Sequence, residues 1–152
     1  MEFDENNRPE EEQPVEIYSR RAIFWFSILP FPAFGGILLA LNLKNAGFKR
    51  AILPVIFFSI LFTVATRLLI SRLLTAYNVV VPANYKMDDN VLNEKVVFIG
   101  MISIICNIIG ATILTRYFFK QYFPDNDYYP RNITIPLIAA VLLYLLGGLA
   151  GI

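Results

Sequence analysis

Few side chains in this chain could carry chemistry, and the two most prominent ones lie within long apolar stretches. These two polar candidates are Arg67 and Asn107. A guanidinium can bind an anion, and a carboxamide can both donate and accept hydrogen bonds. General acid–base catalysis requires instead a positioned imidazole or carboxylate, and the apolar stretches contain neither. We therefore predict no catalytic residue and expect that the chain is not an enzyme.

Metal and redox chemistry lack suitable ligands. The chain has no His and a single Cys, Cys106, which lies among aliphatic residues and is typical of a small apolar filler. Asp88, Asp89 and Glu94 are close in sequence, but their spacing lacks the alternating ligands and central glycine of a calcium-binding loop. We expect no metal and no cofactor.

Arg67 and Asn107 each have two interpretations. Arg67 lies about 16 residues, at 1.5 Å each, beyond Ala51, within a turn or two of the far end of its apolar stretch. We favour a side chain that extends toward lipid phosphates over a cation that lines a polar cavity. Asn107 should hydrogen-bond to a neighbouring helix, worth about 0.6–2 kcal/mol, rather than contact a transported solute.

A cluster of prolines and glycines interrupts the first apolar stretch. Pro30 and Pro32 lie near its middle, and Gly35 and Gly36 follow. Because proline removes a helical hydrogen bond and clashes with an earlier carbonyl, we predict a kink or a short unwound segment. Such breaks form substrate or ion sites in transporters. They also serve close helix packing, which we favour because no acidic residue accompanies the break.

Four stretches without Asp, Glu or Lys predict the elements that position these residues. About 20 apolar residues at 1.5 Å each match a hydrocarbon core of about 30 Å, and helices satisfy their own backbone groups in lipid. We predict an all-α polytopic membrane protein with four transmembrane helices, arranged as two antiparallel hairpins. The predicted spans are about 22–43, 51–71, 96–115 and 133–152. In the last one, Gly147 and Gly151 are four residues apart and predict a packing face.

The first 18 residues differ from the rest of the chain, which is 57% hydrophobic and 16% charged. Seven of the twelve acidic residues lie in the first sixteen positions. Such a segment cannot bury enough apolar surface to offset its ordering entropy. We predict an acidic, disordered tail over 1–18 and a four-helix transmembrane domain over 19–152. The tail either solvates the chain or docks with a basic partner.

Basic and aromatic residues alternate between residues 116 and 132, where seven side chains are aromatic. This pattern can stack nucleic acid in a soluble protein, but next to an apolar helix it is typical of an interfacial belt. We therefore expect no nucleic-acid partner. The expected partners are the lipid bilayer and either a membrane-protein partner or a second copy of the chain.

The basic residues near the ends of the four stretches leave the orientation nearly undecided. Four crossings would place both termini on the same side. The rule that basic residues stay in the cytoplasm gives almost equal counts for the two orientations. A slight preference places the turns 44–50 and 116–131 in the cytoplasm, because the first is dense in bases and has no acid.

Three segments carry a family resemblance: Ile17-Tyr-Ser-Arg-Arg-Ala-Ile23, Phe34-Gly-Gly-Ile-Leu-Leu-Ala-Leu-Asn-Leu-Lys44, and Tyr117-Phe-Phe-Lys-Gln-Tyr-Phe-Pro124 with Ile135-Pro-Leu137 after it. From Ile17 onward the chain resembles a family of small uncharacterised multi-pass membrane proteins of Bacteroidota-type bacteria. The resemblance implies a protein of the bacterial inner membrane with about four helices. It implies no activity, ligand or catalytic residue.

Three functions follow as expectations. We favour a non-enzymatic accessory or assembly protein, because small residues are abundant at potential helix interfaces and no reactive constellation is present. The alternative is a small-solute or ion transporter or channel that uses the break at 30–36, Asn107 and Arg67. The lack of an intramembrane acid or His argues against it. An intramembrane enzyme is the weakest of the three.

Overall fold

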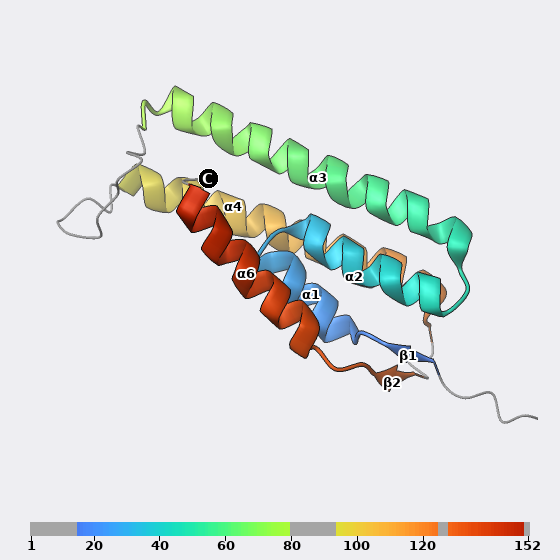
Figure 1. Cartoon of the computed structure of the whole chain (residues 1–152). Coiled ribbons are helices and arrows are strands. Elements are labelled where there is room, and N and C mark those ends of the chain that lie inside the picture. Colours follow the sequence, from blue (N-terminus) through green and yellow to red (C-terminus); the bar gives the residue numbers. More distant parts are fainter. Residues whose placement is uncertain (1–14, 80–93, 125–127, 151–152) are drawn as a thin grey trace, which may run out of the picture.

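The computed structural model describes residues 15–79, 94–124 and 128–150, with side chains described as far as Leu146 (Figure 1). The helices and strands, in chain order, are β1 (Glu16–Ile17), α1 (Arg20–Ile28), α2 (Pro32–Asn45), α3 (Lys49–Ala76), α4 (Glu94–Ile113), η2 (Leu114–Phe119), α5 (Lys120–Tyr122), β2 (Tyr129–Pro130) and α6 (Thr134–Ala150). Apart from one pair of two-residue strands, the described part is helical, which confirms the predicted all-α class.

Two helices in the described ranges are long and apolar enough to cross a membrane, by length and composition. One is α3, with 28 residues, and the other is the continuous run of α4, η2 and α5 from Glu94 to Tyr122, with 29 residues. α6 is apolar but shorter, with 17 residues. By this criterion the structure supports two of the four predicted crossings.

The first predicted span, 22–43, forms a hairpin instead of one transmembrane helix. α1 ends at Ile28, α2 begins at Pro32, and the two helices run antiparallel (Figure 1). Near the tip of the hairpin, the rings of Phe26 and Phe34 are 5.6 Å apart. The break occurs where the prolines predicted it, but the prediction of a single crossing is wrong because the chain reverses there.

Hydrogen bonds close the base of this hairpin. The Tyr18 backbone N–H donates to Asn42 Oδ1, and Asn42 Nδ2 donates to the Tyr18 carbonyl, both at 2.8 Å. Both residues are buried. The two ends of the first apolar stretch therefore lie at the same end of the molecule.

The last residues of the predicted tail belong to the fold. Ile17 and Tyr18 are buried, and β1 pairs in parallel with β2 so that Glu16 lies opposite Tyr129. The Arg131 N–H also donates to the Ile17 carbonyl at 2.8 Å. The prediction of a disordered segment up to residue 18 is wrong for 16–18, because this short segment buries apolar side chains. The prediction for residues 1–14 lies outside the described residues.

Two adjacent glycines let α2 approach helices on both sides. A Cβ atom built on Gly35 would overlap with Ser27 Oγ of α1 and lie 2.9 Å from the Ile23 carbonyl oxygen. One built on Gly36 would overlap with the Ser59 side chain of α3. α2 is therefore packed tightly between α1 and α3.

The apolar core is concentrated around the hairpin and η2. Ile23, Leu39, Leu43, Leu114 and Phe119 are among its fully buried side chains. The long helices, in contrast, present large apolar side chains outward. The exposed fraction is 77% for Leu53 and 67% for Phe57 on α3, and 56% for Ile105 on α4.

Candidate binding cavity

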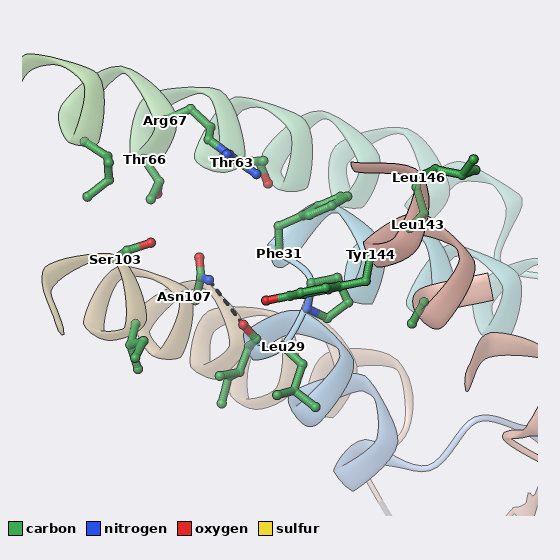
Figure 2. A pocket seen from close by; sticks show the side chains of 15 residues that line it. Leu29, Phe31, Thr63, Thr66, Arg67, Ser103, Asn107, Leu143, Tyr144 and Leu146 are labelled. Carbon is green, nitrogen blue, oxygen red and sulfur yellow. Dashed lines mark hydrogen bonds between the residues drawn. The ribbon is translucent and has the colours of Figure 1, made fainter. Parts of the chain in front are cut away.

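A cavity of about 790 Å³ lies beyond the tip of the hairpin, between α3, α4 and α6 (Figure 2). We call it the tip cavity. Its apolar lining comes from the hairpin tip, α3, α4 and α6, and Tyr144 of α6 contributes an aromatic ring. The polar side chains of α3 and α4 that line it are Thr63, Thr66, Arg67, Ser103 and Asn107.

One polar side chain from each long helix holds the hairpin tip. Asn107 Nδ2 of α4 donates to the Ile28 carbonyl at 3.2 Å, and Thr63 Oγ1 of α3 accepts from the Ala33 N–H at 3.0 Å. Ends of helices leave such backbone groups without intrahelical partners. Asn107 thus makes an interhelical hydrogen bond of the kind that its mid-helix position predicts.

The prolines at the tip reduce the number of backbone groups that need partners. Pro30 and Pro32 have no N–H, and the Phe34 N–H donates to the Phe31 carbonyl at 3.0 Å. Pro32 also occupies the first position of α2, where its fixed φ suits the start of a helix. The sequence between the two helices can therefore turn in an apolar environment at a small cost in unpaired donors.

Arg67 extends from α3 toward Thr63 at the tip cavity (Figure 2). Within residues 15–79, 94–124 and 128–150, its guanidinium makes no hydrogen bond and no ion pair. The acidic residues in these ranges are Glu16 and Glu94, and neither lines the cavity. The donors of this cation are thus available to a ligand that enters the cavity.

The sequence contains a signal for this site that lies in the spacing of polar residues rather than in their types. Ser59, Thr63, Thr66 and Arg67 are spaced so that they share one face of α3, within an otherwise apolar helix. The Ser59 hydroxyl donates to the Val55 carbonyl at 2.6 Å, and the Thr63 hydroxyl donates to the Ser59 carbonyl at 2.8 Å. Such bonding lets hydroxyl side chains sit in an apolar helix.

Ser103 completes the polar lining from α4, one turn before Asn107. Its hydroxyl points into the space between α3 and α4 in Figure 2. The Tyr144 hydroxyl points into the same space from the opposite wall of the cavity. The cavity therefore combines a cation with neutral hydrogen-bonding groups. These groups can bind and orient an anion, but they offer no general acid or base.

The four glycines predicted to serve helix packing have different positions. Gly35 and Gly36 lie at helix contacts and do not line the tip cavity, in agreement with a packing role. Gly147 belongs to the end of α6, where side-chain contacts are not described, and Gly151 lies outside the described residues. The packing face of these two glycines therefore stays a prediction.

No group of three His, Cys, Asp or Glu residues that could hold a metal occurs in the part of the chain that the structure describes. No family model, no curated protein and no solved structure matches this chain. The family resemblance of the three segments therefore remains an expectation.

Proposed function

We propose that this chain is a multi-pass protein of the bacterial inner membrane. The apolar exposure of its long helices supports this placement. In an apolar stretch of 18 residues from each long helix, only 11% is buried within the chain for α3 and 17% for the α4–α5 run. The core helix of a water-soluble protein would be mostly buried, because exposing large aliphatic and aromatic side chains to water costs about 25 cal/mol per Å². Lipid removes this cost.

The hairpin also supports an orientation. Because α1 and α2 fold back, Arg20 and Arg21 lie at the same end as the turn 44–50 and the described part of the turn 116–131. The contact between the rings of Phe48 and Tyr122, 5.4 Å apart, joins these two turns. The bases at this end are Arg20, Arg21, Lys44, Lys49, Arg50, Arg116, Lys120 and Arg131. Within the described ranges, only Arg72 and Lys95 lie near the opposite ends of the long helices. The basic end is therefore cytoplasmic.

In this orientation the α1–α2 hairpin enters the membrane from the cytoplasm and returns to it. α3, the α4–α5 run and α6 then cross, so the N-terminus is inside and the C-terminus is outside. The hairpin tip reaches the level of Thr63, about 18 Å along α3 from Ala51 at 1.5 Å per residue. The tip cavity occupies the remaining, outer part of the membrane.

The protein acts as a transporter or channel for a small anionic solute. The observation that carries this proposal is the position of Arg67, which has no ion-pair or hydrogen-bond partner among the described residues, beside hydroxyl and carboxamide groups in the tip cavity. A cation in this environment is costly unless it faces a polar cavity or a partner. The lack of an intramembrane acid or His argues against coupling to protons or cations, but an anion requires only a cation and donors.

The N-terminus of α2 adds to the attraction for an anion. Its first turn lies at the tip, and the partial positive charge at the start of a helix favours negative groups. This contribution comes from the helix dipole alone, because no residue of α2 lines the tip cavity and the N–H groups of Ala33 and Phe34 already donate to Thr63 and Phe31. The carbonyl end of α1 is also at the tip, but Asn107 covers its Ile28 carbonyl.

Anion flux into liposomes tests this function. Purified protein in liposomes should pass one or more of chloride, nitrate, phosphate and acetate above the leakage of empty vesicles. Arg67→Gln should reduce the flux to that leakage, and Arg67→Lys should retain part of it. Arg72→Gln is the matched control, since Arg72 is exposed on the same helix and does not line the tip cavity. Equal flux through the wild type and Arg67→Gln would refute the proposal.

An accessory or assembly protein is the second candidate, and α6 is the observation that favours it. Among its described side chains only Pro136 is buried, so its apolar surface is available to another membrane protein. Cross-linking from a cysteine at Leu145, which is 59% exposed, should then recover a stoichiometric partner from native membranes. Recovery of lipid adducts alone would remove the support for this candidate.

A further inference from the structure

A second cavity, of about 350 Å³, lies between the start of α1 and the end of α4 with η2. We call it the arginine cavity, because Arg20, Arg21 and Arg116 line it. It is separate from the tip cavity and shares no lining residue with it. In the orientation proposed above, it lies at the cytoplasmic surface of the membrane.

The fold brings these three arginines together from positions almost 100 residues apart in sequence. Ser19 caps α1 by accepting from the Ala22 N–H at 3.2 Å, so Arg20 and Arg21 occupy the first turn of the helix. The Arg20 N–H donates to the Tyr128 hydroxyl at 3.5 Å, which ties this turn to the segment before α6.

The π-helix η2 brings the third arginine to the same place. The hydrogen bonds of a π-helix span five residues instead of the four of an α-helix, and π-helices occur often at functional sites. Leu114 and Phe119, five residues apart, are both fully buried here, and Thr115 is buried as well. This register leaves Arg116 exposed at the edge of η2, where it faces the first turn of α1 across the cavity.

No negative charge compensates this cluster in the described part of the chain. The arginine cavity has no acidic lining residue, and none of its three guanidinium groups makes an ion pair or hydrogen bond there. Thr112 also lines it and can donate a hydroxyl hydrogen. Like charges that line one cavity repel one another, so a bound anion would stabilise the arrangement.

The surroundings indicate the source of the anion. Trp25 lines the arginine cavity and is 58% exposed, as is typical of side chains that anchor at the level of lipid headgroups. Phe24 adds a second ring, in edge contact with Trp25 at 5.9 Å. Guanidinium groups bind phosphate oxygens through paired hydrogen bonds, and basic pockets between membrane helices bind anionic headgroups.

We infer that the arginine cavity binds the phosphate group of an anionic membrane lipid. This inference rests on the membrane location proposed above, but not on the transport of an anion. The lipid phosphate in the arginine cavity stays at the cytoplasmic surface, next to the base of the hairpin. There it holds α1 to the end of α4.

Native mass spectrometry of the full-length protein from nanodiscs tests the inference. Nanodiscs of phosphatidylcholine with a fraction of phosphatidylglycerol should yield protein that retains phosphatidylglycerol. Arg21→Gln and Arg116→Gln should each weaken this retention by about tenfold to a hundredfold, which is the effect of losing a hydrogen bond to a charged group. Arg116→Lys should retain part of it.

Two control variants separate this site from other positive charges. Lys120→Gln removes an exposed base one turn beyond Arg116 that does not line the arginine cavity, and it should leave lipid retention unchanged. Arg67→Gln should abolish anion flux and also leave retention unchanged, so the two proposals fail independently. Equal retention by wild type, Arg21→Gln and Arg116→Gln would overturn the inference.

Inorganic phosphate distinguishes a lipid from a free ion. Phosphatidylglycerol in the nanodisc should raise the melting temperature of the protein. Millimolar phosphate, added to the protein in nanodiscs of phosphatidylcholine alone, should not raise it. If phosphate alone raised the melting temperature as much, and Arg116→Gln removed that rise, the assignment to a lipid would be wrong.

Discussion

Tyr18 and Asn42 exchange two hydrogen bonds of 2.8 Å at the base of the α1–α2 hairpin. One carboxamide thereby satisfies both backbone groups of a buried residue that is 24 positions away in the chain. This pair joins the segment before α1 to the end of α2. It therefore holds the two ends of the first apolar stretch at the same end of the molecule.

Loss of this pair should destabilise the protein. Asn42→Leu leaves the buried N–H and carbonyl of Tyr18 without partners, and we expect a loss of about 2 kcal/mol or more in the free energy of unfolding. Unfolding in detergent, followed by circular dichroism, measures the change. Asn45→Leu is the matched control, since Asn45 is exposed three residues later on the same helix. A similar small effect of both substitutions would show that the two hydrogen bonds between Tyr18 and Asn42 contribute little to stability.

The close packing of α2 on α3 gives a second prediction. Gly36→Ala places a methyl group against Ser59 and should cost about 1–3 kcal/mol, as overpacking commonly does. The double variant with Ser59→Gly should recover part of that loss. Gly100→Ala is the control, because nothing packs within 4 Å of the position that its methyl group would take, and it should be neutral or stabilising by up to about 1 kcal/mol. Thermal unfolding in detergent distinguishes these outcomes.

Water should reach the tip cavity from outside the cell. In a Cys106→Ser background, Ser103→Cys should react with a membrane-impermeant thiol reagent, since the reactive thiolate forms only where water is present. Ile109→Cys lies on the same helix and lines neither cavity, so it should stay unlabelled. Mass spectrometry of labelled whole cells measures both. Labelling of Ile109→Cys at the rate of Ser103→Cys would mean that the reagent does not report on the cavity.

The orientation can be tested with reporter fusions. A hairpin followed by three crossings places the N-terminus inside and the C-terminus outside, whereas four crossings place both on one side. Alkaline phosphatase fused after residue 152 should be active, and a fluorescent protein fused before residue 1 should fluoresce. An inactive phosphatase, together with fluorescence at both ends, would restore the arrangement with four crossings.

Local sequence is sufficient to predict the break in the first apolar stretch but not its angle. Pro30 and Pro32 remove helical hydrogen bonds wherever they occur, so the interruption follows from residue type alone. The reversal depends on distant partners, namely Asn42 for Tyr18, Thr63 for Ala33 and Asn107 for Ile28. No pattern within residues 22–43 specifies these partners, and the length of the stretch matches a crossing.

The candidate site, too, is predictable from the sequence only in part. Arg67 and Asn107 stand out as isolated polar residues in apolar sequence, and both line the tip cavity. Thr63 and Thr66 are not conspicuous by type, although their helical spacing to Arg67 is visible in the sequence. The arginine cavity could not be predicted, because the register of η2 places Arg116 in the same cavity as Arg20, and no residue type in 114–119 indicates a π-helix.

α6 supplies a wall of the tip cavity through Ala140, Leu143 and Tyr144. Among its described side chains only Pro136 is buried, while Ala139 and Ala140 are partly buried against the core. An element that buries so little apolar surface can move away at a small cost in free energy. In the proposed membrane location, lateral pressure from the acyl chains would then help to hold this wall in place. We expect the affinity for a solute to depend on the thickness and stiffness of the bilayer, which makes the lipid a structural component of the binding site.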